Sequence, residues 1–263
     1  MTLVGRVDSL WRYPVKSMRG EELREIFVGF PGVYGDRAYA FRSAAGRKAF
    51  PYFTAREQAR MLRFRAAYRH AERMTAPPNL AEAEALGPGV TPLYADLADW
   101  AVDVETPSGE VLAVDDTRLI DMLRAGAREG TTLSLLRSER ALTDCRPLSL
   151  ISLQSVGQLS REVGVDLDKR RFRANVYVDL ADAAGFGEDA WVGRRLRIGA
   201  KTGIAVTERD PRCMMITLDP DTTEANPEVM RRVAKGHDGM TGLYAAVLTE
   251  GVMRAGDAIT LLD

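Results

Sequence analysis

The stretch Val7-Asp8-Ser9-Leu10-Trp11-Arg12-Tyr13-Pro14 indicates what kind of fold the chain adopts. Successive side chains of a β-strand point to opposite faces, so a period of two is typical of a strand. The residues that share one face here are Val7, Ser9, Trp11 and Tyr13. Pro14 has no backbone N–H to donate to a neighbouring strand, and it ends the run. The sequence therefore predicts a strand near the N-terminus that leads into a loop.

Short strands and turn signals continue along the rest of the chain. Further strands are expected at residues 23–28, 37–41, 61–68, 175–180, 195–198, 204–207, 215–218, 243–249 and 258–262, with a hairpin over 100–114. Helices are expected at 117–127, from a Ser152 cap to Gly164, and from an Asn226-Pro227 cap to Gly236. Many short strands with few helices favour an α+β protein centred on a β-barrel.

Length and charge limit the classes of function. The 263 residues suffice for one large domain or two small ones. The 36 basic residues are balanced by 37 acidic ones, whereas a general nucleic-acid or membrane surface needs an excess of basic charge. No apolar run approaches the roughly 20 residues that span a bilayer, and Met1 to Trp11 has no core of signal-peptide type. We expect a cytoplasmic protein that binds neither nucleic acid nor a membrane.

The scarce residues restrict the chemistry. The chain has two cysteines, Cys145 and Cys213, and two histidines, His70 and His237. No pair of these has the spacing of zinc ligands, and an iron–sulfur cluster held by four cysteines is excluded by the count. Two cysteines in a cytosolic protein are expected to stay reduced. Any chemistry must therefore use one thiol, carboxylates or a bound cofactor.

Cys213 is the candidate thiol. It ends the segment Arg209-Asp210-Pro211-Arg212-Cys213, directly after the strand expected at 204–207. Two arginines near a cysteine create a positive potential that favours the thiolate, the form that binds soft metals or attacks electrophiles. The alternative is that Cys213 is a small buried hydrophobic residue beside two methionines.

A basic segment lies at residues 168–175. In a strand, Arg171 and Arg173 would point to the same face, with the Asn175 amide beyond them. Two parallel guanidinium groups suit an anion such as a phosphate. The alternative is a solvated basic edge.

A second basic segment follows Pro14. A loop whose backbone N–H groups, Lys16 ammonium and Ser17 hydroxyl converge would also bind a phosphate. Gly35-Asp36-Arg37 adds another arginine at the start of an expected strand. The alternative for Arg37 is a turn with an internal ion pair.

Five motifs taken together carry a resemblance to a known family. They are Leu10-Trp11-Arg12-Tyr13-Pro14-Val15-Lys16-Ser17, Gly35-Asp36-Arg37, Arg171-Phe172-Arg173-Ala174-Asn175, Arg212-Cys213 and Leu218-Asp219-Pro220-Asp221-Thr222. In this order they resemble the MOSC proteins, relatives of the C-terminal domain of molybdenum cofactor sulfurase. The resemblance runs from Val4 almost to the C-terminus. It implies an N-terminal β-barrel domain at 1–115 packed against a MOSC β-barrel domain at 116–263.

The resemblance also implies roles for single residues. Cys213 would coordinate molybdenum that is also held by the dithiolene sulfurs of a pterin. The pterin phosphate would be bound by Lys16, Ser17 and Met18 with help from Arg37, and the cofactor would be lined by Arg173 and Asn175. Arg212 would serve charge balance or substrate contact. Many relatives carry a small hydroxyl residue where this chain has Pro211, so we expect a hydrogen bond near the metal to be missing.

By similarity to the amidoxime-reducing members, the chain would be a molybdenum-dependent reductase of N-hydroxylated compounds. The metal would take the oxygen, and Asp210 is a candidate for proton delivery. Since the sequence has no cluster or flavin motif, the electron donor would be another protein of the ferredoxin or flavin reductase type. The alternative is a non-catalytic protein that binds or carries the molybdenum cofactor, or that delivers sulfur through a persulfide on Cys213.

Overall fold

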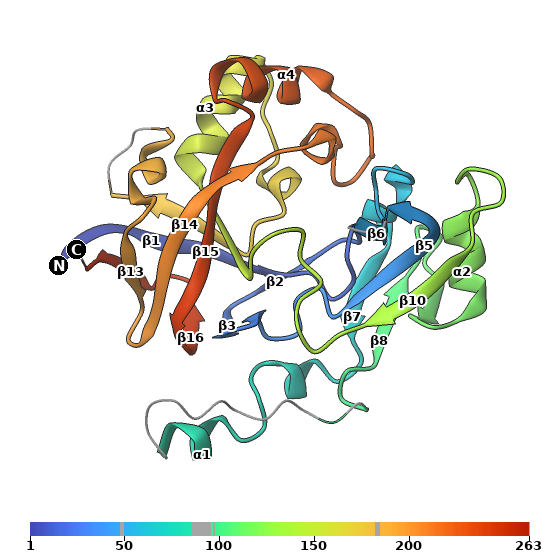
Figure 1. Ribbon diagram of the computed structural model, residues 1–263, viewed down its shortest axis with the longest axis horizontal. Coiled ribbons are helices and arrows are strands. Elements are labelled where there is room, and N and C mark those ends of the chain that lie inside the picture. Colours follow the sequence, from blue (N-terminus) through green and yellow to red (C-terminus); the bar gives the residue numbers. More distant parts are fainter. Residues whose placement is uncertain (48–49, 86–95, 97, 182–184, 263) are drawn as a thin grey trace. The chain divides into compact units, whose positions relative to one another are not determined.

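Figure 1 shows the computed structural model, which describes residues 1–47, 50–85, 96, 98–181 and 185–262. The chain forms two compact units, each assembled from separate stretches. The first unit comprises Met1–Arg12, Glu22–Val33 and Thr143–Asp263, and the second comprises Tyr13–Glu21 and Tyr34–Leu142. The domain boundary expected between residues 115 and 116 stays a prediction. The two compact units do not follow a single boundary, because their stretches alternate along the sequence.

A closed barrel of seven strands is the centre of the first unit. Its strands follow the order β12 (Val176–Leu180), β11 (Leu148–Ser152), β15 (Met240–Thr249), β14 (Thr202–Pro211), β13 (Arg195–Ile198), β17 (Ala258–Leu261) and β1 (Thr2–Arg12). The ring closes because β1 pairs antiparallel with both β12 and β17. The short strand β2 (Glu21–Leu23) also pairs with β1. The expected α+β fold with a β-barrel is confirmed.

The strand predicted from residues 7–13 is β1, which stops at Arg12 just before Pro14. Its inward residues alternate at first, and burial becomes continuous from Ser9 to Arg12, where both faces are covered. Gly5 allows the close approach of β12, since a Cβ there would lie 2.7 Å from the Asp179 carbonyl oxygen.

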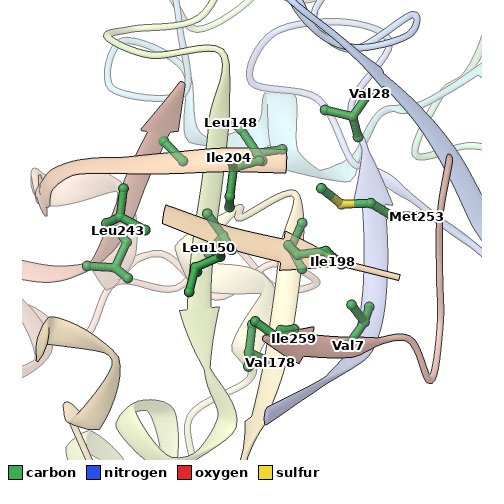
Figure 2. Close-up of a cluster of buried hydrophobic side chains, with 14 of the residues drawn as sticks. Val7, Val28, Leu148, Leu150, Val178, Ile198, Ile204, Leu243, Met253 and Ile259 are labelled. Atoms are coloured by element: carbon green, nitrogen blue, oxygen red, sulfur yellow. The ribbon is translucent and has the colours of Figure 1, made fainter. Parts of the chain in front are cut away.

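Aliphatic side chains fill the barrel (Figure 2). Val7, Val178, Leu150, Leu243, Ile204, Ile198 and Ile259 come from its seven strands, and Val28 and Met253 pack against them. The last two belong to a small sheet of β3 (Glu25–Gly29), β4 (Gly32–Val33) and β16 (Gly251–Arg254). Each such side chain stabilises the fold by about 1.5–3 kcal/mol when fully buried. This core holds β12 and β14 in place, and these strands border the candidate site residues Asn175 and Cys213.

Two helices that pack on each other accompany the barrel, α3 (Leu153–Val163) and α4 (Pro227–Gly236) (Figure 1). Both predicted N-caps are confirmed: Ser152 accepts a hydrogen bond from Ser155 N, and Asn226 accepts one from Glu228 N. The 3-10 helices of this unit are η3 (Lys169–Phe172), η4 (Gly187–Trp191) and η5 (Met214–Thr217).

The described residues of the second unit form two three-stranded sheets. One consists of β10 (Leu133–Arg137), β5 (Tyr39–Arg47) and β6 (Phe50–Phe53), and the other of β7 (Arg65–Tyr68), β8 (Val102–Glu105) and β9 (Val111–Ala113). The helical segments are η1 (Ala59–Arg63), η2 (Ala71–Met74), α1 (Leu80–Ala85) and α2 (Thr117–Arg124). Trp100 anchors the core, with the rings of Tyr34 and Tyr68 packed edge-on against it.

Four predicted strands are partly or wholly wrong. The strand expected at 23–28 is interrupted at Arg24, which lies between β2 and β3. Of residues 215–218, the first three lie in η5, where Thr217 Oγ1 donates to the Met214 carbonyl, and Leu218 is its C-cap; residues 61–63 end η1. Short apolar runs of this kind do not distinguish a strand from a helical turn. Arg37 precedes β5 and has a φ of 46°, which a strand does not allow.

Candidate functional site

Cys213 lies at the end of a barrel strand, two residues after β14. Its backbone is extended (φ −126°), and it occupies the cap position before η5. The side chain is a free thiol and is half-buried, so it is accessible rather than part of the apolar core. Cys145, the other cysteine, is an exposed free thiol.

The two arginines that precede Cys213 in its segment, Arg209 and Arg212, both pair with carboxylates. Arg209 Nε lies 2.9 Å from the Asp189 carboxylate, and its Nη1 lies 3.3 Å from Asp238. Arg212 Nη1 lies 2.9 Å from Asp210 Oδ2. Neither arginine presents an uncompensated charge to the thiol, so the positive potential expected from the sequence is largely cancelled by these carboxylates.

Asp210 belongs to a buried polar group at this end of β14. It is only 3% exposed, and it hydrogen-bonds the Tyr244 side chain as well as Arg212. Burial and the neighbouring Asp210 carboxylate raise the pKa of Tyr244 above its ordinary value. Tyr244 is a neighbour of Asp210 that sequence reasoning missed, because the two meet only through the pairing of β14 with β15.

The segment 169–173 is not a strand, which was the condition under which Arg171 and Arg173 would point to one face. Lys169–Phe172 forms η3, with Asp168 as its N-cap, and Arg173 follows in the left-handed region with a φ of 52°. Arg171 and Arg173 therefore do not share the face of a strand. The side chain of Arg171 is bound to the Thr217 carbonyl at 2.8 Å and to the Asp219 carboxylate at 2.9 Å.

Asp219 organises the turn after η5. Its Oδ1 accepts hydrogen bonds from the backbone N–H groups of Asp221 and Thr222. Burial alone would raise the pKa of Asp219, but these hydrogen bonds and the Arg171 charge outweigh it and hold the pKa below its usual range. The motif at residues 218–222 thus ties the loop that follows Cys213 to η3.

Asn175 is 1% exposed and joins three barrel strands. Its Oδ1 accepts hydrogen bonds from Ser149 N and Oγ, and its Nδ2 donates to the Trp11 carbonyl. These contacts give Asn175 a structural role. Its expected contact with a cofactor stays a prediction.

Within the second unit, the segment that follows Pro14 lies beside the turn of Arg37. Lys16 N donates to the Tyr39 carbonyl, and Arg37 N donates to the Tyr13 carbonyl. Arg37 forms an ion pair with Asp36, which is the internal pair that the alternative interpretation expected. The structure thus brings Arg37 close to the segment of Lys16 and Ser17.

Lys16 is 4% exposed. Its ammonium donates to the Leu142 carbonyl at 2.7 Å and lies 4.7 Å from the centre of the Tyr52 ring. Met18 is fully buried, and its N–H donates to the Val15 carbonyl. The expected phosphate contacts of Lys16 and Met18 stay predictions.

Left-handed backbone is concentrated at the predicted cofactor residues. Among the described residues, six other than glycine have a positive φ, and three of these are Ser17 (66°), Arg37 (46°) and Arg173 (52°). This conformation costs roughly 1–2 kcal/mol for a residue with a side chain, and it persists at sites that the surroundings constrain. No sequence pattern predicts this strain, and it supports a functional role for these three positions.

In the described part of the chain, no three histidine, cysteine, aspartate or glutamate side chains gather as ligands for a metal ion. Nor does any helix among those residues have the length and apolar character needed to cross a bilayer.

Comparison with known proteins gives the family. The model of the MOSC domain matches residues 137–260, and that of the MOSC N-terminal beta barrel domain matches residues 4–105. Mitochondrial amidoxime reducing component 2 of Macaca fascicularis is 27% identical over 132 residues, and the Rattus norvegicus protein of that name is 29% identical over 134. Each match spans 38% of the relative's length and less than half of this chain (45% and 46%).

Among solved structures, YuaD from Bacillus subtilis aligns over 98% of this chain and 94% of its own, with 11% identity and a TM-score of 0.44. YiiM from Geobacillus stearothermophilus aligns over 45% of this chain and 55% of its own, with 16% identity and a TM-score of 0.35.

Proposed function

Because this chain belongs to the MOSC family, we propose that it binds a molybdenum cofactor through Cys213 and reduces N-hydroxylated compounds with an external electron donor. The observation that carries the proposal is a half-buried free thiol at the end of a barrel strand. The names of the macaque and rat relatives, which are amidoxime reducing components, support the choice of reaction.

The residues present fit this cofactor. No cluster of three or more protein ligands is found among the described residues, so a metal at Cys213 must bring most of its ligands with it. Molybdenum held by the dithiolene of a pterin does so, and a thiolate is a suitable soft ligand to complete its shell. Cys213 is assigned to the metal.

We assign the binding of the anionic cofactor to Lys16, Ser17, Met18, Arg37, Arg173 and Asn175. Backbone strain at Ser17, Arg37 and Arg173 supports this assignment, because strained residues cluster at ligand sites. Asn175 would act through the position of its backbone and of the nearby Arg173, since its own side chain is engaged by residues of β11 and β1.

When bound, the cofactor supplies oxygen-atom transfer. Reduction of an N–OH group to N–H consumes two electrons and two protons and releases water. Cys213 would hold and orient the metal, and Arg212 and Asp210 belong to the same short segment of the chain. Because Asp210 is buried and paired with Arg212, we assign it first to holding that guanidinium and only second to proton delivery.

The electrons come from a partner protein in this proposal, of the ferredoxin or flavin reductase type. The competing function uses the same thiol: the chain would bind or carry the molybdenum cofactor, or transfer sulfur through a persulfide on Cys213. The half-buried free thiol favours both functions equally, so activity has to separate them.

The test begins with metal analysis of protein made in a host that synthesises the cofactor. We expect close to one molybdenum per chain, lost in Cys213→Ala and retained in Cys145→Ser, which removes the exposed thiol as a matched control. Benzamidoxime and other N-hydroxylated compounds are then offered with reduced benzyl viologen. Turnover supports the reductase, whereas metal-loaded protein that is inert to all of them supports the carrier. Protein without molybdenum contradicts the reductase and the cofactor carrier, and it leaves sulfur transfer through Cys213 as the remaining function.

A further inference from the structure

The Arg212 side chain connects three separate stretches of the first unit. Its Nε donates to the Thr241 carbonyl at 2.7 Å, and its Nη1 donates to the Phe172 carbonyl at 2.9 Å. Thr241 is the second residue of β15, and Phe172 ends η3. The guanidinium is only 8% exposed, so these charged hydrogen bonds are shielded from water.

The backbone of Arg212 is held as well. Its N–H donates to the Gly239 carbonyl at 2.8 Å, in the turn that joins α4 to β15. The residue is therefore fixed at both its main chain and its side chain. Cys213 is the next residue after Arg212, and Arg173 is the next residue after Phe172. The hydrogen bond from Arg212 to the Phe172 carbonyl consequently sets the spacing between the Cys213 and Arg173 backbones.

The space around the guanidinium is shaped for arginine. It lies over the Phe172 ring, 5.6 Å from the ring centre. Its Nη2 occupies room left by Gly242: a Cβ on that glycine would lie 2.9 Å from Nη2 and 2.7 Å from the Leu150 carbonyl oxygen. A lysine has one ammonium and no planar fork, so it cannot bind both carbonyls and Asp210 in the same way.

Asp210 balances the buried charge. Its Oδ2 lies 2.9 Å from Arg212 Nη1, and Tyr244 hydrogen-bonds the same carboxylate. Removing one partner of a buried pair leaves the other charge uncompensated, which is strongly unfavourable. Asp210 therefore holds Arg212 in the position from which it reaches the Phe172 and Thr241 carbonyls.

We propose that Arg212 is a positioning residue that fixes Cys213 relative to Arg173, with Asp210 as its counter-ion. The inference rests on the proposed function only in that Cys213 and Arg173 serve one ligand there. The fixed spacing itself is a property of the cofactor-free protein, and it is tested there.

The test measures alkylation of Cys213 by iodoacetamide in cofactor-free protein that carries Cys145→Ser, so that one thiol remains. We expect Arg212→Lys to increase the rate at least roughly tenfold, which corresponds to about 1.4 kcal/mol less protection. Asp210→Asn should also accelerate alkylation, and it serves as the second variant if Arg212→Lys does not fold. Arg209→Lys is the matched control, because Arg209 lies three residues before Arg212 and pairs with the Asp189 and Asp238 carboxylates but binds neither Phe172 nor Thr241. Its rate should stay within about twofold of the parent rate.

The dependence of the rate on urea separates positioning from general destabilisation. Local opening of the Cys213 loop exposes little surface, so the accelerated rate should be nearly independent of urea well below the unfolding transition. The proposal is overturned if Arg212→Lys alkylates at the parent rate, if Arg209→Lys is accelerated equally, or if the acceleration rises with urea as steeply as global unfolding. A protein that behaves as expected here but takes up no molybdenum would contradict the proposed function alone.

Discussion

Replacing Ser17 by glycine is expected to stabilise the protein and at the same time to weaken its hold on the cofactor. Ser17 has a φ of 66°, in the region that costs a residue with a side chain roughly 1–2 kcal/mol. Glycine adopts this region without that cost but gains entropy in the unfolded chain worth about 0.5–1 kcal/mol. The difference between the central values is a net stabilisation of about 0.75 kcal/mol, within a range of about 0–1.5 kcal/mol. In a protein of this size it raises Tm by about 1–4 °C.

The assay is thermal unfolding of cofactor-free Ser17→Gly together with molybdenum content after expression in a cofactor-competent host. Thr223→Gly is the matched control, because Thr223 has the same φ of 66° and no expected role in cofactor binding. We expect both variants to melt higher, and only Ser17→Gly to lose molybdenum. A Ser17→Gly protein that melts lower, or that retains as much molybdenum as Thr223→Gly, would refute the link between strain and binding.

Three further outcomes follow from the first unit. Burial would raise the pKa of Glu162, but hydrogen bonds from His237 and Gln158 lower it below its ordinary value of 4.5. The Glu162 carboxylate and its hydrogen bonds therefore stabilise the fold above pH 4.5, and this contribution is lost as the pH falls. In urea titrations, the free energy of unfolding of Glu162→Gln should decrease less in acid than that of the parent. Asn175→Ala leaves buried groups of β1 and β11 without partners, and the free energy of unfolding should fall by about 2–4 kcal/mol. Gly5→Ala pushes a methyl group towards the Asp179 carbonyl and should lower the urea midpoint by an amount equivalent to about 1–3 kcal/mol, with an unchanged slope.

Elements that depend on local chemistry could be predicted from the sequence. Nearby residues predict both the strand that stops before Pro14 and the helix capped by Asn226. Both elements are found where expected. The α+β barrel class follows from the number of such short strands. The segment 215–218 could not be assigned in this way, because its apolar residues suit a strand and a 3-10 turn equally.

The candidate site was predictable in its residue types and not in their contacts. The sequence placed Arg212 beside Cys213, but its partners at Phe172 and Thr241 become neighbours only when the barrel closes. The left-handed backbone at Arg37 and Arg173 could not be predicted from the sequence either, because tertiary packing rather than residue propensity imposes it. Pairing of Arg209 with Asp189 likewise depends on η4, far from it in sequence.

The closure of the barrel by β1 has a consequence for synthesis of the protein. Thr2 faces Leu261 across the β1–β17 pair, so in a nascent chain β1 cannot complete this pairing until the ribosome has also delivered β17. Pairings of such long range form slowly, and the unpaired edges remain available to other chains meanwhile. β14, which leads to Cys213, is joined to β1 through β13 and β17, so the loop that would receive the metal acquires its final support only when translation has passed residue 261.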